Sequence, residues 1–554
     1  MASCNGLSHS FFPCSSKIRP GFARIGKIEP ARLGSMYGAG KQKWSIQASG
    51  PSRPHQDCPD KFAIDYEEKI DEIRQVLESK GEDDPSESLV LVDAIQRVGL
   101  SSYYEEEIET LLLKHYVASC SCIYGYHSLH DVSLLFRLLR QHGHYISPDV
   151  FNNFRGKDGR FRRNLSQDIR GLIELYEAAQ LSFQGEYILD EAARFSSHRL
   201  RECLADVDDE VSRMITSKLK YPHHKTIARL ARKDFLQDLE GINGWRKDFK
   251  GAGSYGFAQG AICLAQKLKL VRNQLPKWYT WSMSILIDDF SLSLQRVALT
   301  KSIAIVYLID DIFDVVGTLD ELTIFTEAVN KWDYAAVDTL PDYMKMCYLA
   351  LLDTTNNIGR EICKRHGHDP IDSLKASWGT LCSAFLVEAK WLASGDLPTA
   401  DKYLENAKVS TGVYVVLVHL FFLLGLGNGD TIHLNDVSQL ISSVATVLRL
   451  WDDLGSAKDE HQDGRDGSYP ECYRKDHRGL SVAQARDHAI DTIASEWKNL
   501  NKECFHLYHL SASSFKRASL NLARITPLMY DYDDNQRLPV LEEYVKFMLL
   551  NQTT

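Results

Sequence analysis

The sequence predicts an all-α protein built from two helical domains. From about residue 60 onward, apolar residues recur at spacings of three and four, as on the buried face of a helix, and the alternating pattern of strands is scarce. The chain has 554 residues, of which 44% are hydrophobic and 25% charged, so it can bury more than one core. Glycines cluster at residues 242–260, where we expect the joint between the two domains.

The first 50 residues differ in composition from the rest of the chain. They hold seven lysine or arginine residues, eight serines and a single acid, Glu29. A serine-rich, basic and acid-poor leader without an apolar core is typical of an organellar transit peptide, and the serines favour the plastid over the mitochondrion. We therefore expect a transit peptide at residues 1–50 and a mature protein in the chloroplast stroma; a disordered tail is the alternative.

Residues 60–262 are predicted to form an N-terminal helical domain and residues 263–554 a C-terminal one. HDVSLLFRLLRQHG, for example, places its leucines on one helical stripe and ends at Gly143. GAGSYG, at residues 251–256, matches the G-x-G-x-x-G pattern. Its flanks are helical and the acid expected about 20 residues later is missing, so we expect no dinucleotide site there.

Three aspartates interrupt the apolar run KSIAIVYLIDDIFDVVG. On a helix, Asp310 and Asp314 share a face, and Asp311 lies one turn before Asp314. Carboxylates this close cannot all stay ionised in apolar surroundings without cations, and Mg²⁺ prefers oxygen ligands, often together with substrate phosphates. The run therefore predicts a divalent-metal site, with a solvated acidic helix end as the alternative.

A second acidic stripe lies in RLWDDLGSAKDE, directly after an apolar helix. Asp452, Ser456 and Glu460 follow one another at spacings of four, so they form one row of oxygen ligands along two turns. Two such rows on facing helices would hold several Mg²⁺ ions around one diphosphate. Surface polarity is the alternative, and the serine within the row argues against it.

Composition limits the partners that we expect. The net charge of −10 argues against nucleic acid. The longest apolar run, VYVVLVHLFFLLGLG from Val413, is short for a bilayer span and contains His419, so we expect a core helix and no membrane partner. The twelve cysteines are scattered, with one tight pair at Cys120 and Cys122, and are expected to be buried free thiols.

DDIFD followed by DDLGSAKDE in a helical chain resembles the class I terpene synthases of plants, and the resemblance covers essentially everything after residue 60. Prenyl-chain elongating enzymes share the first motif, but their pattern has two D-D-x-x-D motifs. The second motif here is D-D-L-x-S-x-x-x-E, which favours ionisation and rearrangement over chain elongation. The resemblance implies an enzyme that ionises a prenyl diphosphate in a C-terminal helical bundle. The N-terminal, α-barrel-like domain would be catalytically silent.

The resemblance also implies a set of metal ligands. Asp310 and Asp314 would bind two Mg²⁺ ions, with Asp311 in support. A third ion would be held by the second stripe (Asp452, Ser456 and Glu460). Mn²⁺ would be able to substitute.

Two arginines and two aromatic residues are further candidates. Arg449 lies one turn before the second stripe and would contact the diphosphate. Arg272 matches the first arginine of the family's Arg-x-Arg element, although the second arginine is replaced by Gln274. Trp281 and Tyr530 are the candidates for ring faces that stabilise a carbocation without offering a nucleophile.

Two more segments carry predictions. Residues 410–412 precede the apolar run and are expected to form a helix break against the pocket, whose carbonyl groups could steer the cation or a water molecule. ADVDDE contains a D-x-D-D pattern at residues 206–209, the form that class II cyclases use for protonation. It lies in a strongly charged segment, so we expect a solvated helix start.

The implied product is an acyclic alcohol. Cyclising monoterpene synthases usually carry R-R-x8-W after the leader, and ASGPSRPHQDCPDKFAIDYEEKIDEI has neither Arg-Arg nor Trp. With a plastid leader, this implies that geranyl diphosphate and water give linalool, and that farnesyl diphosphate would give nerolidol. The alternatives are a cyclising monoterpene or sesquiterpene synthase and a helical diphosphate-binding or scaffold protein without turnover. A monomer is the expectation that follows from the resemblance.

Overall fold

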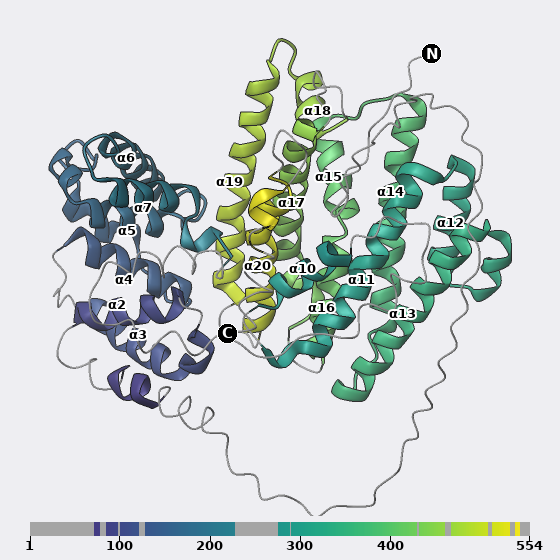
Figure 1. Ribbon diagram of the computed structural model, residues 1–554, viewed down its shortest axis with the longest axis horizontal. Coiled ribbons are helices and arrows are strands. Elements are labelled where there is room, and N and C mark those ends of the chain that lie inside the picture. The colour runs from purple at the N-terminus through teal and green to yellow at the C-terminus, as the bar shows by residue number, and fades with distance from the viewer. Residues whose placement is uncertain are drawn as a thin grey trace, which may run out of the picture.

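The computed structural model of the chain is all-α, as predicted. It describes residues 71–77, 85–97, 100–120, 128–227, 275–287, 290–428, 432–459, 467–507, 512–531, 538–542 and 544. Among these residues the extended pairing is limited to one isolated bridge, Arg155–Phe161. Figure 1 shows two helical bodies, one formed by the N-terminal helices and one by the helices from α10 onward.

The N-terminal body packs its helices around one main core and one smaller core. Its helices are α2 (Pro85–Arg97), α3 (Glu105–Cys120), α4 (Leu129–Gln141), α5 (Ile169–Ala179), α6 (Tyr187–Cys203) and α7 (Asp209–Lys220). In α4 the four predicted leucines are buried, and the chain leaves the helix through Gly143 at a φ of 71°. The predicted amphipathic helix is therefore present.

The C-terminal body is a larger bundle around a single extensive core. Its helices are α10 (Leu275–Ile285), α11 (Ser293–Asp311), α12 (Leu319–Lys331), α13 (Asp342–His366), α14 (Ile371–Ser394), α15 (Ala400–Ser410), α16 (Val413–Leu423), α17 (Ser438–Asp459), α18 (Tyr469–Asp476), α19 (Val482–His506) and α20 (Ser513–Met529). α16 packs against α11, α14, α17 and α20, so it lies among the helices that carry the candidate site.

The apolar run from Val413 forms α16 and is buried within the bundle, as predicted. The segment Ala400–Leu423, which comprises α15 and α16, is long and apolar enough to be compared with a membrane span, but 78% of its apolar window is buried inside the protein. A break separates the two helices. Gly412 caps α16 with a φ of 75°, a backbone conformation that side chains disfavour, so the predicted break at residues 410–412 is confirmed.

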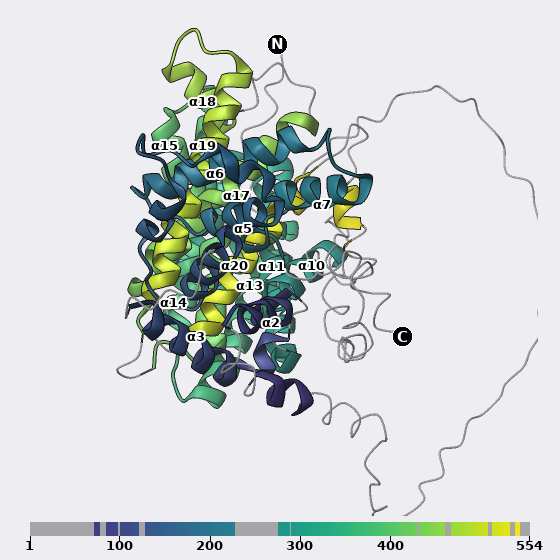
Figure 2. The ribbon, with the colours of Figure 1, turned by 90° about the vertical axis from the view of Figure 1, so that its left-hand side faces the viewer.

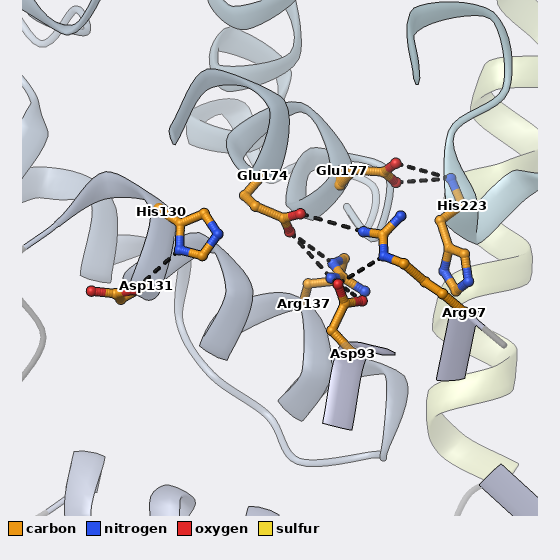
Figure 3. A network of polar contacts seen from close by, with 8 residues as sticks. All are labelled: Asp93, Arg97, His130, Asp131, Arg137, Glu174, Glu177 and His223. Atoms are coloured by element: carbon orange, nitrogen blue, oxygen red, sulfur yellow. Dashed lines mark hydrogen bonds and ion pairs between the residues drawn. The ribbon is translucent and has the colours of Figure 1, made fainter. Parts of the chain in front are cut away.

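A network of buried charges holds the N-terminal body together (Figure 3). Arg137 lies 2.6 Å from Asp93 and 3.2 Å from Glu174, and Arg97 lies 2.7 Å from Asp93. Glu177 accepts the backbone N–H of His223 at 2.9 and 3.1 Å. The network joins α2, α4 and α5 to the segment that leads toward the C-terminal body.

The two bodies meet along α19 and α20, on the side where Figures 1 and 2 show the N-terminal helices. Asn501 of α19 donates hydrogen bonds to the carbonyl oxygens of Gln180 and Ser182 at 2.8 and 3.1 Å, and it pairs with His224 at 2.8 Å. Lys498 forms an ion pair with Asp190 at 2.6 Å. These contacts fix the N-terminal body against one side of the bundle.

Several smaller predictions can be compared with the structure. The D-x-D-D pattern is an exposed helix start, as expected, in which Asp208 caps α7 by accepting the N–H of Val211. The described cysteines are free thiols, but Cys363 is exposed and Cys203 partly exposed, so the expectation of burial is wrong for these two. The side chains of the Cys120–Cys122 pair, the G-x-G-x-x-G pattern and the leader lie outside the described residues.

Candidate active site

The first acidic motif lies where α11 ends. Asp310 is on the last α-helical turn and is fully buried, and Asp314 lies on a π-helical turn, Ile312–Val316. The N–H of Gly317 donates to the carbonyl oxygen of Ile312 at 2.8 Å, five residues earlier, which closes this wider turn. The sequence predicted a regular helix through the motif; the π turn is a local departure, and such turns are frequent at functional sites.

The carboxylate of Asp314 is surrounded by other acids and has no described hydrogen-bond donor. Both of its carboxylate oxygens are buried, and no described group donates a hydrogen bond to them. Burial raises the pKa of Asp314 well above its ordinary value, and the negative charges of Asp310, Glu388 and Asp311 raise it further, while Arg449 opposes the shift. A buried carboxylate without a hydrogen-bond donor is costly for the fold, so a bound cation would relieve it.

The second motif lies on α17, where Arg449 is fully buried between two aspartates. Its Nη1 is 3.8 Å from Asp452 and its Nε is 3.1 Å from Asp453. Asp453 also accepts the Tyr403 hydroxyl at 3.0 Å and the Tyr469 N–H at 2.9 Å, so its role is to hold Arg449 in place. The Nη2 of Arg449 is buried and has no described hydrogen-bond partner, which leaves it available to an anion.

The two motifs lie close enough to affect each other. Burial raises the pKa of Asp452 well above its ordinary value. Asp453 and Asp310 raise this pKa further, whereas Arg449 and Lys277 lower it. Since Asp310 belongs to α11 and Asp452 to α17, the fold brings together acids that are far apart in the sequence.

Glu388 is a member of this cluster that the sequence reasoning missed. It lies on α14 and is 2% exposed. Burial raises its pKa to about 7, although Arg449 and hydrogen bonds from Ser410 and Asn406 lower it. The available signal was an acid inside the apolar run LCSAFLVEAKWLAS, which is rare without a partner.

The two predicted aromatic residues lie in the bundle core. Trp281 of α10 is fully buried, and its ring N–H donates to the hydroxyl of Tyr307 at 3.3 Å, one turn before the first motif. Tyr530 ends α20, and its backbone lies so close to Gly455 that a Cβ there would come within 2.6 Å of the Tyr530 carbonyl oxygen. Lys277 lies 5.8 Å from the centre of the Tyr530 ring. Both aromatics therefore border the helices that carry the motifs.

Some predicted residues are not described. Arg272 and Glu460 lie outside the described residues, and Ser456 is placed in α17 without a described side chain. A groove of about 630 Å³ between α11 and α13 is lined by residues such as Leu294, Met346 and Arg365, and none of the predicted site residues lines it.

The donor set fits divalent cations. Arg449 and, at Asp452, Lys277 are the cationic groups that act on several buried carboxylates, so the carboxylates outnumber the cationic groups. Within the described part of the chain, no three His, Cys, Asp or Glu side chains form a metal site by themselves. Mg²⁺ is commonly bound by one or two carboxylates with water and substrate phosphates completing its shell, which is the arrangement that these residues would allow.

Comparison with known proteins agrees with this geometry. The family model described as "Terpene synthase family, metal binding domain" matches residues 261–499, and the one described as "Terpene synthase, N-terminal domain" matches residues 43–220. Tricyclene synthase Oc15, chloroplastic, of Antirrhinum majus is 52% identical, over 99% of this chain and 100% of the relative. An (E)-nerolidol synthase of Cannabis sativa is 42% identical, over 92% and 94%. The chloroplastic S-(+)-linalool synthase of Arabidopsis thaliana is 41% identical, over 90% of each chain.

Solved structures show the same fold. Isoprene synthase from grey poplar leaves, in complex with three Mg²⁺ ions and dimethylallyl-S-thiolodiphosphate, superimposes with a TM-score of 0.79 at 28% identity, covering 88% of this chain and 96% of that one. A limonene synthase with 2-fluorolinalyl diphosphate gives a TM-score of 0.80 at 29% identity, covering 90% and 95%.

Proposed function

The chain belongs to the plant terpene synthase family, and on that basis we propose that it converts geranyl diphosphate and water into linalool and diphosphate, and farnesyl diphosphate into nerolidol. The protein is a metal-dependent enzyme that acts on a prenyl diphosphate. The plastid location expected from the leader is confirmed, since Antirrhinum and Arabidopsis relatives are named chloroplastic.

The observation that carries the ionisation step is the buried excess of carboxylates over cationic groups around Arg449. Asp310 and Asp314, with Asp311 in support, would hold two Mg²⁺ ions. A third would be held by the second stripe (Asp452, Ser456 and Glu460). Bound Mg²⁺ supplies Lewis-acid stabilisation of the charge on the departing diphosphate.

The chain's own residues complete the anion site. Arg449, fixed by Asp453, presents its free Nη2 to the diphosphate, and Arg272 is the second cationic candidate. These groups stabilise the negative charge that develops as the C–O bond to the diphosphate breaks. The bond electrons leave with the diphosphate, and the allylic cation remains among apolar helices, where the rings of Trp281 and Tyr530 offer faces that stabilise positive charge.

Water capture then gives the alcohol. An oxygen lone pair of water forms a bond to the tertiary carbon of the cation, and the proton lost from that water passes to the diphosphate. The observation that supports this outcome over ring closure is the missing Arg-Arg and Trp element after the leader. Relatives named linalool and nerolidol synthases, at 41% and 42% identity, are compatible with it.

A cyclising synthase is the second candidate, because relatives at 52% and 55% identity are named tricyclene synthases. In that case the same ionisation would be followed by attack of the distal double bond on the cation. The metal and arginine residues would keep their roles, and only the fate of the cation would differ.

Product analysis tests the proposal. The full chain is incubated with Mg²⁺ and either geranyl or farnesyl diphosphate, and the products are separated by chiral gas chromatography with mass detection. Linalool as the main product from geranyl diphosphate would support water capture. Tricyclene or other ring products would replace the proposal with the cyclising candidate, and nerolidol in the farnesyl reaction would show that the pocket accepts the longer chain.

A further inference from the structure

Glu388 connects the candidate diphosphate end of the site to the break between α15 and α16. Its Oε1 accepts hydrogen bonds from the hydroxyl of Ser410 at 2.6 Å and from the amide of Asn406 at 3.2 Å. Both donors belong to the last turns of α15, directly before Gly412. Ser410 is fully buried, so this tether operates away from solvent.

The second oxygen of Glu388 faces a different environment. Oε2 is buried and accepts no hydrogen bond from a described group, and the same holds for the Nη2 donor of Arg449. The two side chains are not in ion-pair contact, because the ion pairs of Arg449 go to Asp452 and Asp453. Arg449 is nevertheless the main opposing charge that acts on Glu388, and Glu388 in turn acts on Asp314. Glu388 therefore contacts the helix break through one oxygen, while its charge acts on Asp314 of the first acidic motif.

This arrangement gives the break a fixed position. The hydroxyl of Ser410 donates to Glu388 at 2.6 Å, a distance typical of a well-formed O–H···O hydrogen bond, so it fixes the end of α15 relative to α14. A helix end leaves backbone carbonyls without intrahelical partners, and their direction depends on what holds the end in place. α16, which begins at the break, packs against α11 and α17, so a shift of the break would be felt beside both acidic motifs.

We propose that Glu388 is a positioning residue for product choice: through Ser410 it holds the α15–α16 break so that the break orders the water that adds to the carbocation. The inference rests on the proposed function, since it assumes a cation that is quenched within the bundle. Glu388 acts through Ser410 and need not touch the substrate. Loss of the tether would let the cation lose a proton to give acyclic hydrocarbons.

A double-mutant cycle tests the tether. Glu388→Leu, Ser410→Ala and the double variant are compared with the wild type for diphosphate release, kcat, KM and the ratio of alcohol to hydrocarbon from geranyl diphosphate. Each single variant should lower that ratio by about tenfold, as for a misplaced reacting group. In Ser410→Ala, which leaves the charged groups around Arg449 in place, diphosphate release should fall far less. The double variant should be no worse than the more affected single variant, because the two residues share one interaction.

Two controls keep the test decisive. Ser377→Ala, also on α14, removes a buried hydroxyl that donates to the Leu374 carbonyl oxygen at 2.7 Å within its own helix, and it should leave the product ratio unchanged. Ser410→Thr keeps a hydroxyl and should restore the ratio, and it stays informative if Glu388→Leu does not fold. Multiplicative effects in the cycle, or a Ser410→Ala ratio equal to that of Ser377→Ala, would overturn the inference. If the wild type forms cyclic products, the proposed function is wrong. The double-mutant cycle is then evaluated from the ratio of cyclic to acyclic products.

Discussion

The N-terminal and C-terminal bodies each bury a cluster of charged side chains, and the two clusters are balanced in opposite ways. In the N-terminal body, Arg97 and Arg137 face Asp93 and Glu174 within ion-pair distance (Figure 3). Burial alone would raise the pKa of Asp93, but the two arginines lower it below its ordinary value. In the C-terminal body, burial raises the pKa values of Asp314 and Asp452, neighbouring carboxylates raise them further, and Arg449 does not offset the shift.

The contrast distinguishes charges that hold the fold from charges that await a ligand. In the N-terminal cluster Asp93 and Glu174 are both paired with arginines, although the Nη1 of Arg137 has no described hydrogen-bond partner. Removal of one member would expose the cost of burying the others. A cluster with excess negative charge is incomplete until cations and an anionic substrate enter it. We therefore expect opposite responses when one charge is removed from each cluster.

The largest effect is expected for Asp314→Asn. The variant loses a candidate metal ligand, so kcat/KM should fall by about 10³-fold or more, the scale on which a strong transition-state charge interaction is lost. Its melting temperature without metal should be equal to or higher than that of the wild type, because a buried carboxylate without a donor is removed. Steady-state kinetics and thermal unfolding measure the two quantities.

Asp320→Asn is the matched control, since Asp320 is exposed in the first turn of α12, just after the motif. It should retain activity close to that of the wild type. Equal losses in both variants, or a lower melting temperature for Asp314→Asn, would mean that Asp314 supports the fold rather than the chemistry.

The second effect is on stability, in the N-terminal cluster. Arg137→Ala leaves Asp93 and Glu174 without one of their arginines in a buried site, so the free energy of unfolding should fall by about 3–5 kcal/mol. The kcat of the folded fraction should be unchanged. Urea unfolding together with activity per folded molecule checks this. Arg199→Ala, which breaks a partly exposed pair with Glu202, should cost well under about 1 kcal/mol.

The third prediction distinguishes the two charged clusters by the pH dependence of the free energy of unfolding. Burial raises the pKa of Glu388 from 4.5 to about 7, so the folded protein holds a proton that the unfolded chain has released between these values. The free energy of unfolding that depends on this group therefore falls as pH rises from 4.5 to 7, at about 1.4 kcal/mol per pH unit. Asp93 has a lowered pKa, so its contribution is lost only as pH falls below its unfolded value of 3.8.

Glu388→Gln should remove the fall in stability with rising pH that Glu388 causes in the C-terminal cluster. In the absence of metal, the stability of this variant relative to the wild type should rise between pH 5 and pH 7.5, and urea midpoints at the two pH values measure the change. Glu361→Gln, a surface substitution on α13, should show no such change. A difference between Glu388→Gln and wild type that is independent of pH would mean that Glu388 is ionised throughout.

The candidate site was predictable from the sequence where its acids repeat at helical spacing. Asp310, Asp314 and Asp452 were found in this way, and the structure places Asp310 close enough to Asp452 to raise its pKa. Glu388 was missed because it is a single acid on α14, and its partners Asn406 and Ser410 lie on another helix. Helical periodicity cannot show which elements will meet, and the π turn at the first motif has no sequence signature comparable to a cap or a proline.

The fold was predictable to the level of two helical bodies, because amphipathic periodicity reports burial. The N-terminal charge network was not predicted. Asp93, Arg137 and Glu174 lie on three different helices, and each looks like an ordinary surface charge in its own segment. Ion pairs between residues far apart in the sequence depend on how the helices pack. Packing excludes water from these side chains and so strengthens their interaction.

The smallest effect is expected for Asp208→Ala in the D-x-D-D pattern. Asp208 is exposed and caps α7 by accepting the N–H of Val211 at 2.8 Å. Loss of this cap should cost about 1 kcal/mol of stability. Since Asp208 belongs to neither cluster, kcat and the product ratio should stay within error of the wild type, and Asp208→Asn should recover the lost stability because asparagine caps equally well. A marked loss of activity in Asp208→Ala at full folding would give the N-terminal body a catalytic role and would end the contrast between a structural and a reactive cluster.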